Sequence, residues 1–196
     1  MTVDRLEPLD KQRSKVFVDG DFAFVLYRGE IRKYHIEEGA ELAESLYEEI
    51  LTDLLPKRAR ERALYYLQSQ PRTEHEVVKK LRESFYPASA VEETVAFLKE
   101  YRYLDDTAYV RDYLEQNGGR KSRAELFQFL MRKGIPKDLM KEIYEEASHD
   151  SREVILEILK KKHFDRETAS PEEKRKIAAY LNRRGFGYDD ISECLT

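Results

Sequence analysis

The sequence predicts a mainly α-helical protein: an elongated tandem array of three three-helix repeats, preceded by a small antiparallel β-hairpin region plus a helix. Three observations predict this fold. A hydrophobic pattern recurs about every 50 residues, each copy begins with the same helix-capping chemistry, and glycine turns separate β-branched and aromatic runs near the amino terminus. The expected units are residues 1–56, followed by repeats over 57–104, 105–147 and 148–196.

The amino-terminal region between Ser14 and Ile36 has the composition of short strands. Apolar runs over 16–18, 22–27 and 31–36 are separated by Asp-Gly at 19–20 and Arg-Gly at 28–29. Glycine can adopt the positive φ that tight turns require. The pattern therefore predicts two consecutive hairpins in a three-stranded antiparallel sheet.

A helical pattern follows this sheet. Leu42, Leu46, Ile50 and Leu54 share one helix face, and we expect the helix to end before Pro56. Because three short strands are marginal alone, this helix is expected to lie against them. Residues 1–56 carry 7 basic and 13 acidic side chains, so the module either stabilises the fold or docks a partner.

The repeat is defined by helices whose apolar residues align. Leu81, Leu130 and Leu181 occupy equivalent positions, separated by 49 and 51 residues. Each lies four residues after another apolar position, so both fall on one stripe of a helix. The residues expected in the repeat core are Val77, Leu81, Tyr103, Leu104, Leu126, Leu130, Ile177 and Leu181.

Each of these helices begins with a capping box, in which a hydroxyl and a carboxylate satisfy free amides of the first turn. The boxes are Thr73-x-x-Glu76, Ser122-x-x-Glu125 and Ser170-x-x-Glu173. At the other end, Gly134 and Gly185 fit a left-handed helix stop. Phe85 stands at the equivalent position, so the first copy either strains this residue or ends differently.

The segment Tyr101-Arg-Tyr-Leu-Asp-Asp-Thr-Ala-Tyr-Val-Arg resembles the "GYLDD…FA" junction between the first two repeats of RecX proteins, bacterial modulators of the RecA recombinase. The helix start at Arg72-Thr73-Glu74 and the helix end at Arg132-Lys133-Gly134-Ile135 are similar to that family's motifs. The resemblance covers residues 57–196. The chain departs from the family at Arg102 and Phe85, where glycine is usual, and at Tyr109, where phenylalanine is usual.

The resemblance implies a regulatory protein without catalytic activity or cofactors, acting in recombination, DNA repair and the SOS response. Its implied partner is the RecA filament, with single-stranded DNA as part of that filament. Occupancy of the filament groove would hinder filament growth, ATP hydrolysis and strand exchange. The array would touch successive protomers, so that several weak contacts act together.

Composition and motifs argue against several other classes of protein, namely disulfide-bonded, membrane-spanning, secreted and catalytic ones. The chain has 196 residues, with Lys+Arg 35 against Asp+Glu 39, and Cys194 is its single cysteine, which excludes an internal disulfide. No apolar run approaches the roughly 18 residues of a membrane span, and the charged amino terminus is unlike a secretory signal. We therefore expect a cytoplasmic monomer that does not bind membranes. No metal-binding residue is predicted, because the histidines, at His35, His75, His149 and His163, form no ligand motif. No catalytic or cofactor-binding residue is predicted either, because the sequence contains no GxxxxGK(S/T), GxGxxG or GxSxG motif.

The remaining candidates for function are basic residues off the apolar stripes. They could contact DNA phosphates or acidic patches on a protein filament. A solvated face with local ion pairs is the alternative for any single residue, and a module that binds DNA directly without RecA is the alternative for the whole set. The candidates are Arg72, Lys79, Lys80, Arg82, Lys121, Arg123, Arg132, Lys133, Lys174, Arg175, Arg183 and Arg184.

Overall fold

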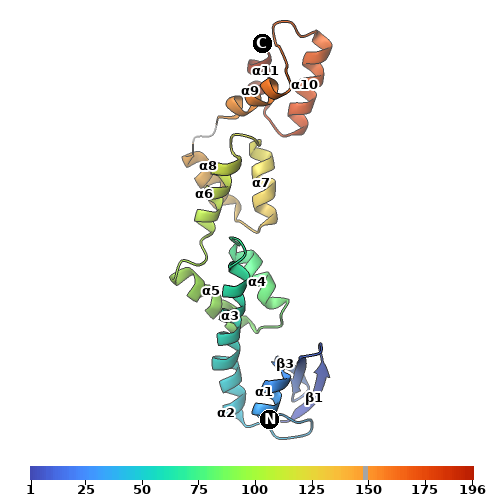
Figure 1. Cartoon of the computed structure of the whole chain (residues 1–196), viewed down its shortest axis with the longest axis vertical. Coiled ribbons are helices and arrows are strands. Elements are labelled where there is room, and N and C mark those ends of the chain that lie inside the picture. The colour runs from blue at the N-terminus through green and yellow to red at the C-terminus, as the bar shows by residue number, and fades with distance from the viewer. Residues whose placement is uncertain (148–149) are drawn as a thin grey trace. The chain divides into compact units, whose positions relative to one another are not determined.

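The computed structural model describes residues 1–147 and 150–196, which form two compact units, Met1–Leu104 and Asp105–Thr196. The first unit contains a three-stranded sheet and helices α1 to α5, and the second contains helices α6 to α11 (Figure 1). The protein is therefore mainly α-helical, as predicted. Within the described ranges, no helix combines the length and apolarity needed to cross a lipid bilayer.

The sheet consists of β1 (Val3–Pro8), β2 (Arg13–Val18) and β3 (Asp21–Tyr27), paired antiparallel in the order β1-β2-β3. Val16 of the central strand lies opposite Leu6 on one side and Phe24 on the other. Asp19 and Gly20 form the turn between β2 and β3 with φ of 50° and 93°. The structure thus confirms the first predicted hairpin.

The second predicted hairpin is wrong, because Arg28 and Gly29 begin helix α1 (Arg28–Lys33). The Glu30 carboxylate accepts a hydrogen bond from the Tyr27 amide at 2.7 Å and an ion pair from Arg58 at 2.9 Å. These contacts stabilise the first turn of the helix, so this segment forms a helix where a strand was expected. The third strand is instead β1, whose charged residues conceal its apolar positions in the sequence.

The helix after the sheet runs past Pro56, so the prediction that it ends there is wrong. Helix α2 (Glu44–Glu49) continues through a π-helical turn, η1 (Ile50–Leu54), into α3 (Leu55–Leu67). A proline removes one amide donor and crowds the carbonyl four residues before it. The π-helical turn ends at Leu54, two residues before Pro56, and changes the hydrogen-bonding pattern there, so the helix continues.

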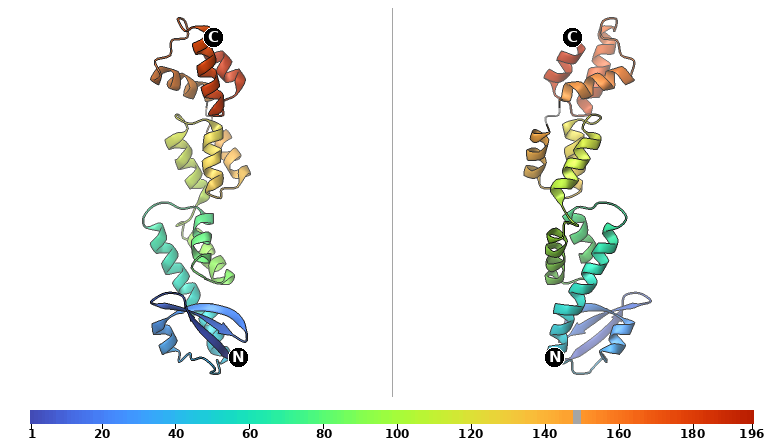
Figure 2. Two further views of the ribbon diagram at one scale, coloured as in Figure 1. Left: turned by 90° about the vertical axis from the view of Figure 1, so that its right-hand side faces the viewer. Right: turned by 60° about the vertical axis from the view of Figure 1, so that its left-hand side comes forward.

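One hydrophobic core serves the whole first unit. It joins Val16 and Phe24 of the sheet to Ala59 of α3 and to Val77 and Leu98 of the helices that follow. Figure 2 shows the sheet beside this long helix from two further directions. Residues 1–56 therefore share their core with the first helical repeat.

Each repeat contains three helices. After α3, the first unit adds α4 (Glu74–Arg82) and α5 (Ala88–Glu100). The second unit contains α6 (Asp106–Asn117), α7 (Arg123–Arg132), α8 (Lys137–Glu146), α9 (Ser151–Lys161), α10 (Pro171–Arg183) and α11 (Tyr188–Leu195). Helices α6–α8 enclose one hydrophobic cluster and α9–α11 enclose another.

The central helix of each trio starts as predicted. In all three, the hydroxyl of the capping residue accepts a hydrogen bond from the amide of the glutamate three residues later. That glutamate's carboxylate accepts one from the amide of the capping residue in return, for example at 2.8 Å for Glu125 and Ser122. The sequence motif alone therefore identifies where α4, α7 and α10 begin.

The same helices also end alike. Phe85, Gly134 and Gly185 have φ of 66°, 78° and 88°. The residue after each donates its amide to the carbonyl of the equivalent leucine in its helix, Leu81, Leu130 or Leu181, at 3.3, 3.1 and 3.3 Å. The first helix thus uses the same left-handed stop as the others, with Phe85 in a conformation that favours glycine.

The expected core residues are buried, with one exception. Tyr103 is 56% exposed, so its placement in the core is wrong. Arg102 before it has φ of 57°, and Leu104 is the residue of this junction that turns inward, at 3% exposed. The other residues of the set, all buried, are Val77, Leu81, Leu104, Leu126, Leu130, Ile177 and Leu181.

Candidate functional site

The twelve basic candidates fall into two groups, according to whether their side chains contact other groups of the protein. In the first group, Arg175 Nε donates a hydrogen bond to the Pro171 carbonyl at 3.2 Å, and the others face aromatic rings or carboxylates: Arg72, Lys80, Lys121, Arg123, Lys133 and Arg184. Within residues 1–147 and 150–196, the second group forms no side-chain hydrogen bond, ion pair or aromatic contact: Lys79, Arg82, Arg132, Lys174 and Arg183. This second group provides the cations that are available to a partner.

In the first repeat, Tyr66 of α3 holds two of the candidates. The Arg72 guanidinium lies 4.4 Å from the centre of its ring and the Lys80 ammonium 5.6 Å from it. Arg72 also pairs with Glu76 at 3.7 Å, and both side chains are 18% exposed. Arg72 therefore has a structural role at the start of α4.

In the second repeat, the candidates lie over aromatic rings. Tyr113 of α6 stacks on Phe129 of α7 with 4.3 Å between ring centres. Lys121 donates a hydrogen bond to the Tyr113 hydroxyl at 2.9 Å, and the Lys133 ammonium lies 5.7 Å from the centre of the Phe129 ring. These lysines thus extend the packing of α6 against α7 to the surface.

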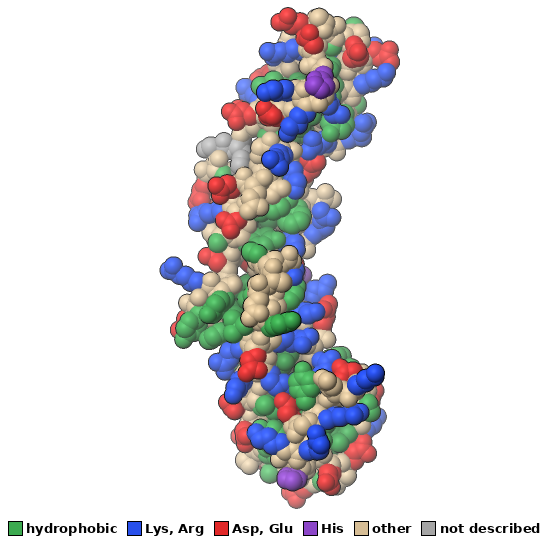
Figure 3. Space-filling model, viewed as in Figure 1, with side chains coloured by type: hydrophobic (Ala, Val, Ile, Leu, Met, Phe, Trp, Pro, Cys, Tyr) green, Lys and Arg blue, Asp and Glu red, His purple; other side chains and the backbone are tan. Residues whose placement is uncertain are grey.

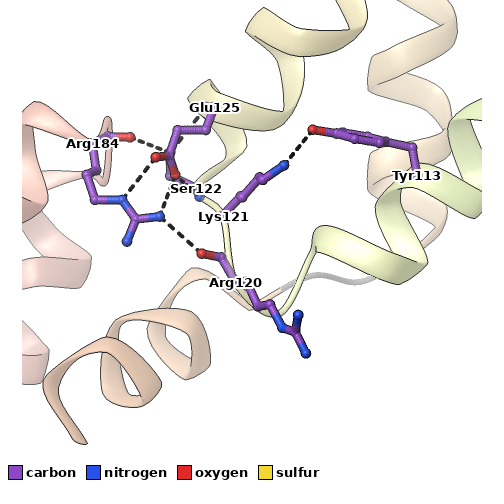
Figure 4. Close-up of polar contacts among 6 residues, drawn as sticks. All are labelled: Tyr113, Arg120, Lys121, Ser122, Glu125 and Arg184. Carbon is purple, nitrogen blue, oxygen red and sulfur yellow. Dashed lines mark hydrogen bonds and ion pairs between the residues drawn. The ribbon is translucent and has the colours of Figure 1, made fainter. Parts of the chain in front are cut away.

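Arg184 connects the second and third repeats. Its Nε and Nη2 donate to the two carboxylate oxygens of Glu125 at 3.0 and 2.9 Å, and Nη2 also donates to the Arg120 carbonyl at 3.1 Å (Figure 4). The Ser122 hydroxyl donates to the Arg184 carbonyl. The end of α10 is therefore bound to the start of α7, and we call Ser122, Glu125 and Arg184 the inter-repeat latch.

The latch has an electrostatic signature. Burial by itself raises the pKa of Glu125, but hydrogen bonds from Arg184 and the Ser122 amide outweigh it and lower the pKa. The same hydrogen bond to Glu125 raises the pKa of Arg184. Both charges are therefore favoured, as expected of a bidentate pair.

Gly185 lies where the end of α10 approaches Ser122 and Ala124 at the start of α7. Its φ is 88°, and a Cβ atom built there would overlap the Cβ of Ala124. Glycine is therefore required at this position both by the backbone conformation and by the space available. The sequence indicates the first reason through the helix stop, but it gives no signal of the second.

Three candidates gather around one groove in the third repeat. Lys174, Arg175 and Arg183 line an open groove of about 680 Å³ between α10 and α11. Its remaining lining residues are apolar or uncharged: Ala178, Ala179, Asn182, Tyr188, Ile191, Ser192, Leu195 and Thr196. We call this surface the α10–α11 groove.

The structure also exposes three tyrosines at the end of α3 and at the junction between the first two repeats. Tyr65, Tyr101 and Tyr103 are 77%, 60% and 56% exposed. Tyr103 and Arg102 line a pocket together with Leu64 and Leu67 at the end of α3 and with residues 68–71 after it. These rings could stack on bases or aromatic side chains. The only sequence signal for them is the number of tyrosines near the junction.

The acidic junction serves as a helix start. Asp105 accepts a hydrogen bond from the Ala108 amide at 2.9 Å and so caps α6. Within the described residues, no group of three histidine, cysteine or acidic side chains could hold a metal ion. His149 lies outside the described residues.

Charge is mixed on the surface. On the face shown in Figure 3, basic and acidic side chains are interspersed over both units. Each unit is therefore expected to use local clusters of cations in binding. The α10–α11 groove is one such cluster, because no acidic side chain lines it.

Family models and curated proteins both match this chain. A model described as the first three-helix domain of RecX matches residues 59–98, and one described as the third matches residues 150–195. A Clostridium botulinum "Regulatory protein RecX" is 32% identical, over 94% of this chain and 89% of its own. The protein of that name from Caldanaerobacter subterraneus is 28% identical, over 100% of this chain and 98% of its own.

Solved structures agree with the fold. A structure titled "Crystal structure of regulatory protein RecX" aligns with a TM-score of 0.61 and 24% identity, covering 98% of each chain. RecX from Lactobacillus salivarius aligns with a TM-score of 0.60 and 20% identity, over 72% of this chain and 94% of that one. At this level of identity, these two structures establish the shared architecture.

Proposed function

The chain belongs to the RecX family, and from this premise we propose that it binds the filament that RecA forms on single-stranded DNA and inhibits it. The inhibited steps are filament growth, ATP hydrolysis and strand exchange during recombination and repair. We propose further that it acts as a cytoplasmic monomer and has no catalytic activity.

The observation that carries this proposal is the repetition of one helical plan. Three trios share the same capped start and the same left-handed end of their central helix. Repeated units suit a partner that is itself repetitive, because each can engage a successive protomer. We propose that the segments 57–104, 105–147 and 148–196 make such successive contacts, so that weak contacts combine into tight binding.

The available cations support the proposal. Lys79, Arg82 and Arg132 are exposed and project from the central helices α4 and α7. They can pair with acidic groups of a filament or with DNA phosphates. Arg72, Lys121 and Arg184 are less suitable, since their charges already face Glu76, Tyr113 and Glu125.

The test is an ATPase titration of RecA from the same organism on single-stranded DNA. We expect inhibition at protein concentrations too low to coat the DNA. The variant Lys79→Glu/Arg82→Glu/Arg132→Glu should require at least tenfold more protein. A matched variant reversing three exposed cations outside the candidate set, Lys57→Glu/Lys141→Glu/Lys161→Glu, should inhibit nearly as well as the parent chain.

The alternative is a module that binds DNA without RecA. In that case, binding to a labelled oligonucleotide would weaken steeply as salt rises, and it would need no recombinase. ATPase inhibition that appears only once the DNA is saturated would favour this alternative. Unchanged ATPase activity at all concentrations would contradict the proposed filament inhibition.

A further inference from the structure

The α10–α11 groove lies at positions equivalent to those where the second repeat packs two aromatic side chains. Positions in the second and third repeats correspond with an offset of 51 residues, so Phe127 is equivalent to Ala178 and Tyr144 to Leu195. In the second repeat, Phe127 and Tyr144 pack edge to face with ring centres 5.5 Å apart. Arg123 covers both rings, at 5.0 and 5.1 Å from their centres.

In the third repeat, smaller side chains leave that space open. Ala178 is half-buried. Ile191 and Leu195 are almost fully buried, at 4% and 8% exposed. Lys174, the equivalent of Arg123, forms no side-chain hydrogen bond, ion pair or aromatic contact within the described residues. The third repeat therefore presents an apolar floor and an unoccupied cation where the second repeat has a closed aromatic cluster.

The charges around the floor indicate the sign of its ligand. Lys174 and Arg175 stand near the start of α10 and Arg183 at its end, while no aspartate or glutamate side chain lines the groove. A ligand along this surface would thus meet positive charge at both ends. Charge complementarity therefore favours an acidic occupant.

The dimensions and chemistry of the floor indicate the form of that occupant. Residues 174 to 183 span about 14 Å along α10, which equals roughly two and a half turns of a second helix. The floor is mainly aliphatic, with Tyr188 as its single aromatic residue, at 77% exposed. An aliphatic floor suits the leucines and isoleucines of a helix better than the flat faces of nucleic-acid bases.

We propose that the α10–α11 groove binds an acidic amphipathic helix of a protein partner. The helix places apolar side chains at i, i+3, i+4 and i+7 over Ala178, Ile191 and Leu195. Its carboxylates pair with Lys174, Arg175 and Arg183. This inference does not depend on filament binding, because the interaction requires neither RecA nor DNA.

The experiment uses a fluorescein-labelled synthetic helix of 16 residues, with leucine on one face and glutamate and alanine elsewhere. Its binding to the full chain is measured by fluorescence anisotropy. We expect saturable binding with one peptide per chain. A peptide of the same composition with scrambled order, which has no apolar face, should bind at least tenfold more weakly.

Two variants test the groove itself. Ala178→Phe introduces the side chain that the second repeat carries and should weaken peptide binding at least tenfold by filling the space. Lys174→Gln/Arg175→Gln/Arg183→Gln should do the same by removing the rim charges while leaving the apolar floor intact. The matched control, Lys137→Gln/Lys141→Gln/Lys160→Gln, removes equal charge from exposed positions of the same unit and should bind like the parent chain.

Several outcomes would overturn the proposal. Equal binding of the scrambled peptide would show simple charge attraction, and unchanged binding by the filled variant would place the peptide elsewhere. If a dT20 oligonucleotide bound and the peptide did not, and the rim variant abolished this binding, the groove would be a nucleic-acid site. If the parent chain bound no peptide but still inhibited the RecA ATPase, the groove proposal would be refuted and the filament proposal would stand.

Discussion

Phe85 and Arg102 adopt the left-handed backbone conformation that favours glycine, with φ of 66° and 57°. The Phe85 ring has compensating contacts, edge to face with Phe22 at 6.2 Å and under the Lys15 ammonium at 5.2 Å. Arg102 is exposed and, within the described residues, its side chain forms no hydrogen bond or ion pair. The strain at Arg102 is therefore not offset by its side chain.

Arg102→Gly is expected to stabilise the first unit. Relief of left-handed strain contributes about 1–2 kcal/mol, and the larger entropy of glycine in the unfolded chain offsets about 0.5–1 kcal/mol of it. The expected net gain in the free energy of unfolding is about 0.5–1 kcal/mol, measured by urea denaturation. Phe85→Gly should have the opposite sign because the ring contacts are lost. A destabilised Arg102→Gly chain would show that the arginine side chain is used.

Gly185→Ala is expected to destabilise the second unit. The new methyl group would overlap Ala124 Cβ, and the left-handed backbone would be strained as well. Together these effects should cost about 2–4 kcal/mol of the free energy of unfolding. Gly20→Ala is the matched control, because Gly20 has φ of 93° with nothing within 4 Å of the new atom. Equal losses in the two variants would mean that α7 and the end of α10 move apart freely.

The inter-repeat latch should make stability depend on pH. Because the pKa of Glu125 is lowered in the folded chain, its contribution is full above the usual value of 4.5 and is lost as pH falls through the folded pKa. Arg184 and Glu125 are 22% and 34% exposed, so solvent screening limits the contribution to about 1 kcal/mol. Glu125→Gln should lower the free energy of unfolding by about 1 kcal/mol at neutral pH and by progressively less below pH 4.5. The matched control is Glu115→Gln, on the exposed surface of α6. Denaturation curves should show that its effect on the free energy of unfolding does not change with pH in this way.

At the scale of elements, the starts and ends of the repeated helices were predictable because local chemistry determines them. The boxes at Thr73, Ser122 and Ser170 form as their spacing predicts. Helix α1 and the passage through Pro56 were not predictable, since a distant residue, Arg58, pairs with Glu30 and a π turn precedes the proline. A tertiary contact at α1 and a change of helix type before Pro56 thus account for the two elements that local patterns assigned wrongly.

The candidate site was predictable in residue type and less so in arrangement. The sequence places most of the twelve cations off the apolar stripes, but it cannot show that Arg184 faces Glu125 while Lys174, Arg175 and Arg183 share a groove. These arrangements depend on how α10 meets α11 and α7. A comparison of Ala178 with Phe127 gives the one sequence signal for the groove, because a smaller residue replaces a larger one at an equivalent position.

The three capping boxes should not contribute equally to stability. Ser122 is 1% exposed, and besides capping α7 its hydroxyl donates to the Arg184 carbonyl. Ser170 is exposed, and its hydroxyl contacts only the first turn of α10 within the described residues. Ser170→Ala should therefore cost about 1 kcal/mol of the free energy of unfolding, and Ser122→Ala about 2 kcal/mol or more. Urea denaturation of both variants checks the order. Equal costs would indicate that the hydroxyl contact with Arg184 adds nothing.

At the scale of the whole molecule, three hydrophobic clusters determine where the chain can be divided into fragments that fold. Sheet and first trio share one cluster, and the clusters of α6–α8 and α9–α11 lie in the second unit with the inter-repeat latch. Residues 1–56 were expected to form a separate module, but α2, η1 and α3 continue through that boundary. Cooperative folding should therefore follow the boundary at Leu104 and Asp105.

Division of the chain at two positions tests this expectation. Fragments 1–104 and 105–196 should each keep their helix content by circular dichroism and unfold cooperatively, because each retains its own buried clusters. Division after Pro56 separates Leu55 from Ala59, both at most 2% exposed, and removes the sheet residues that cover α3. The fragment 57–196 should therefore lose protection from amide hydrogen exchange in α3 to α5 while it keeps protection in α6 to α11. Retained protection in α3 to α5 would show that the first trio folds without the sheet.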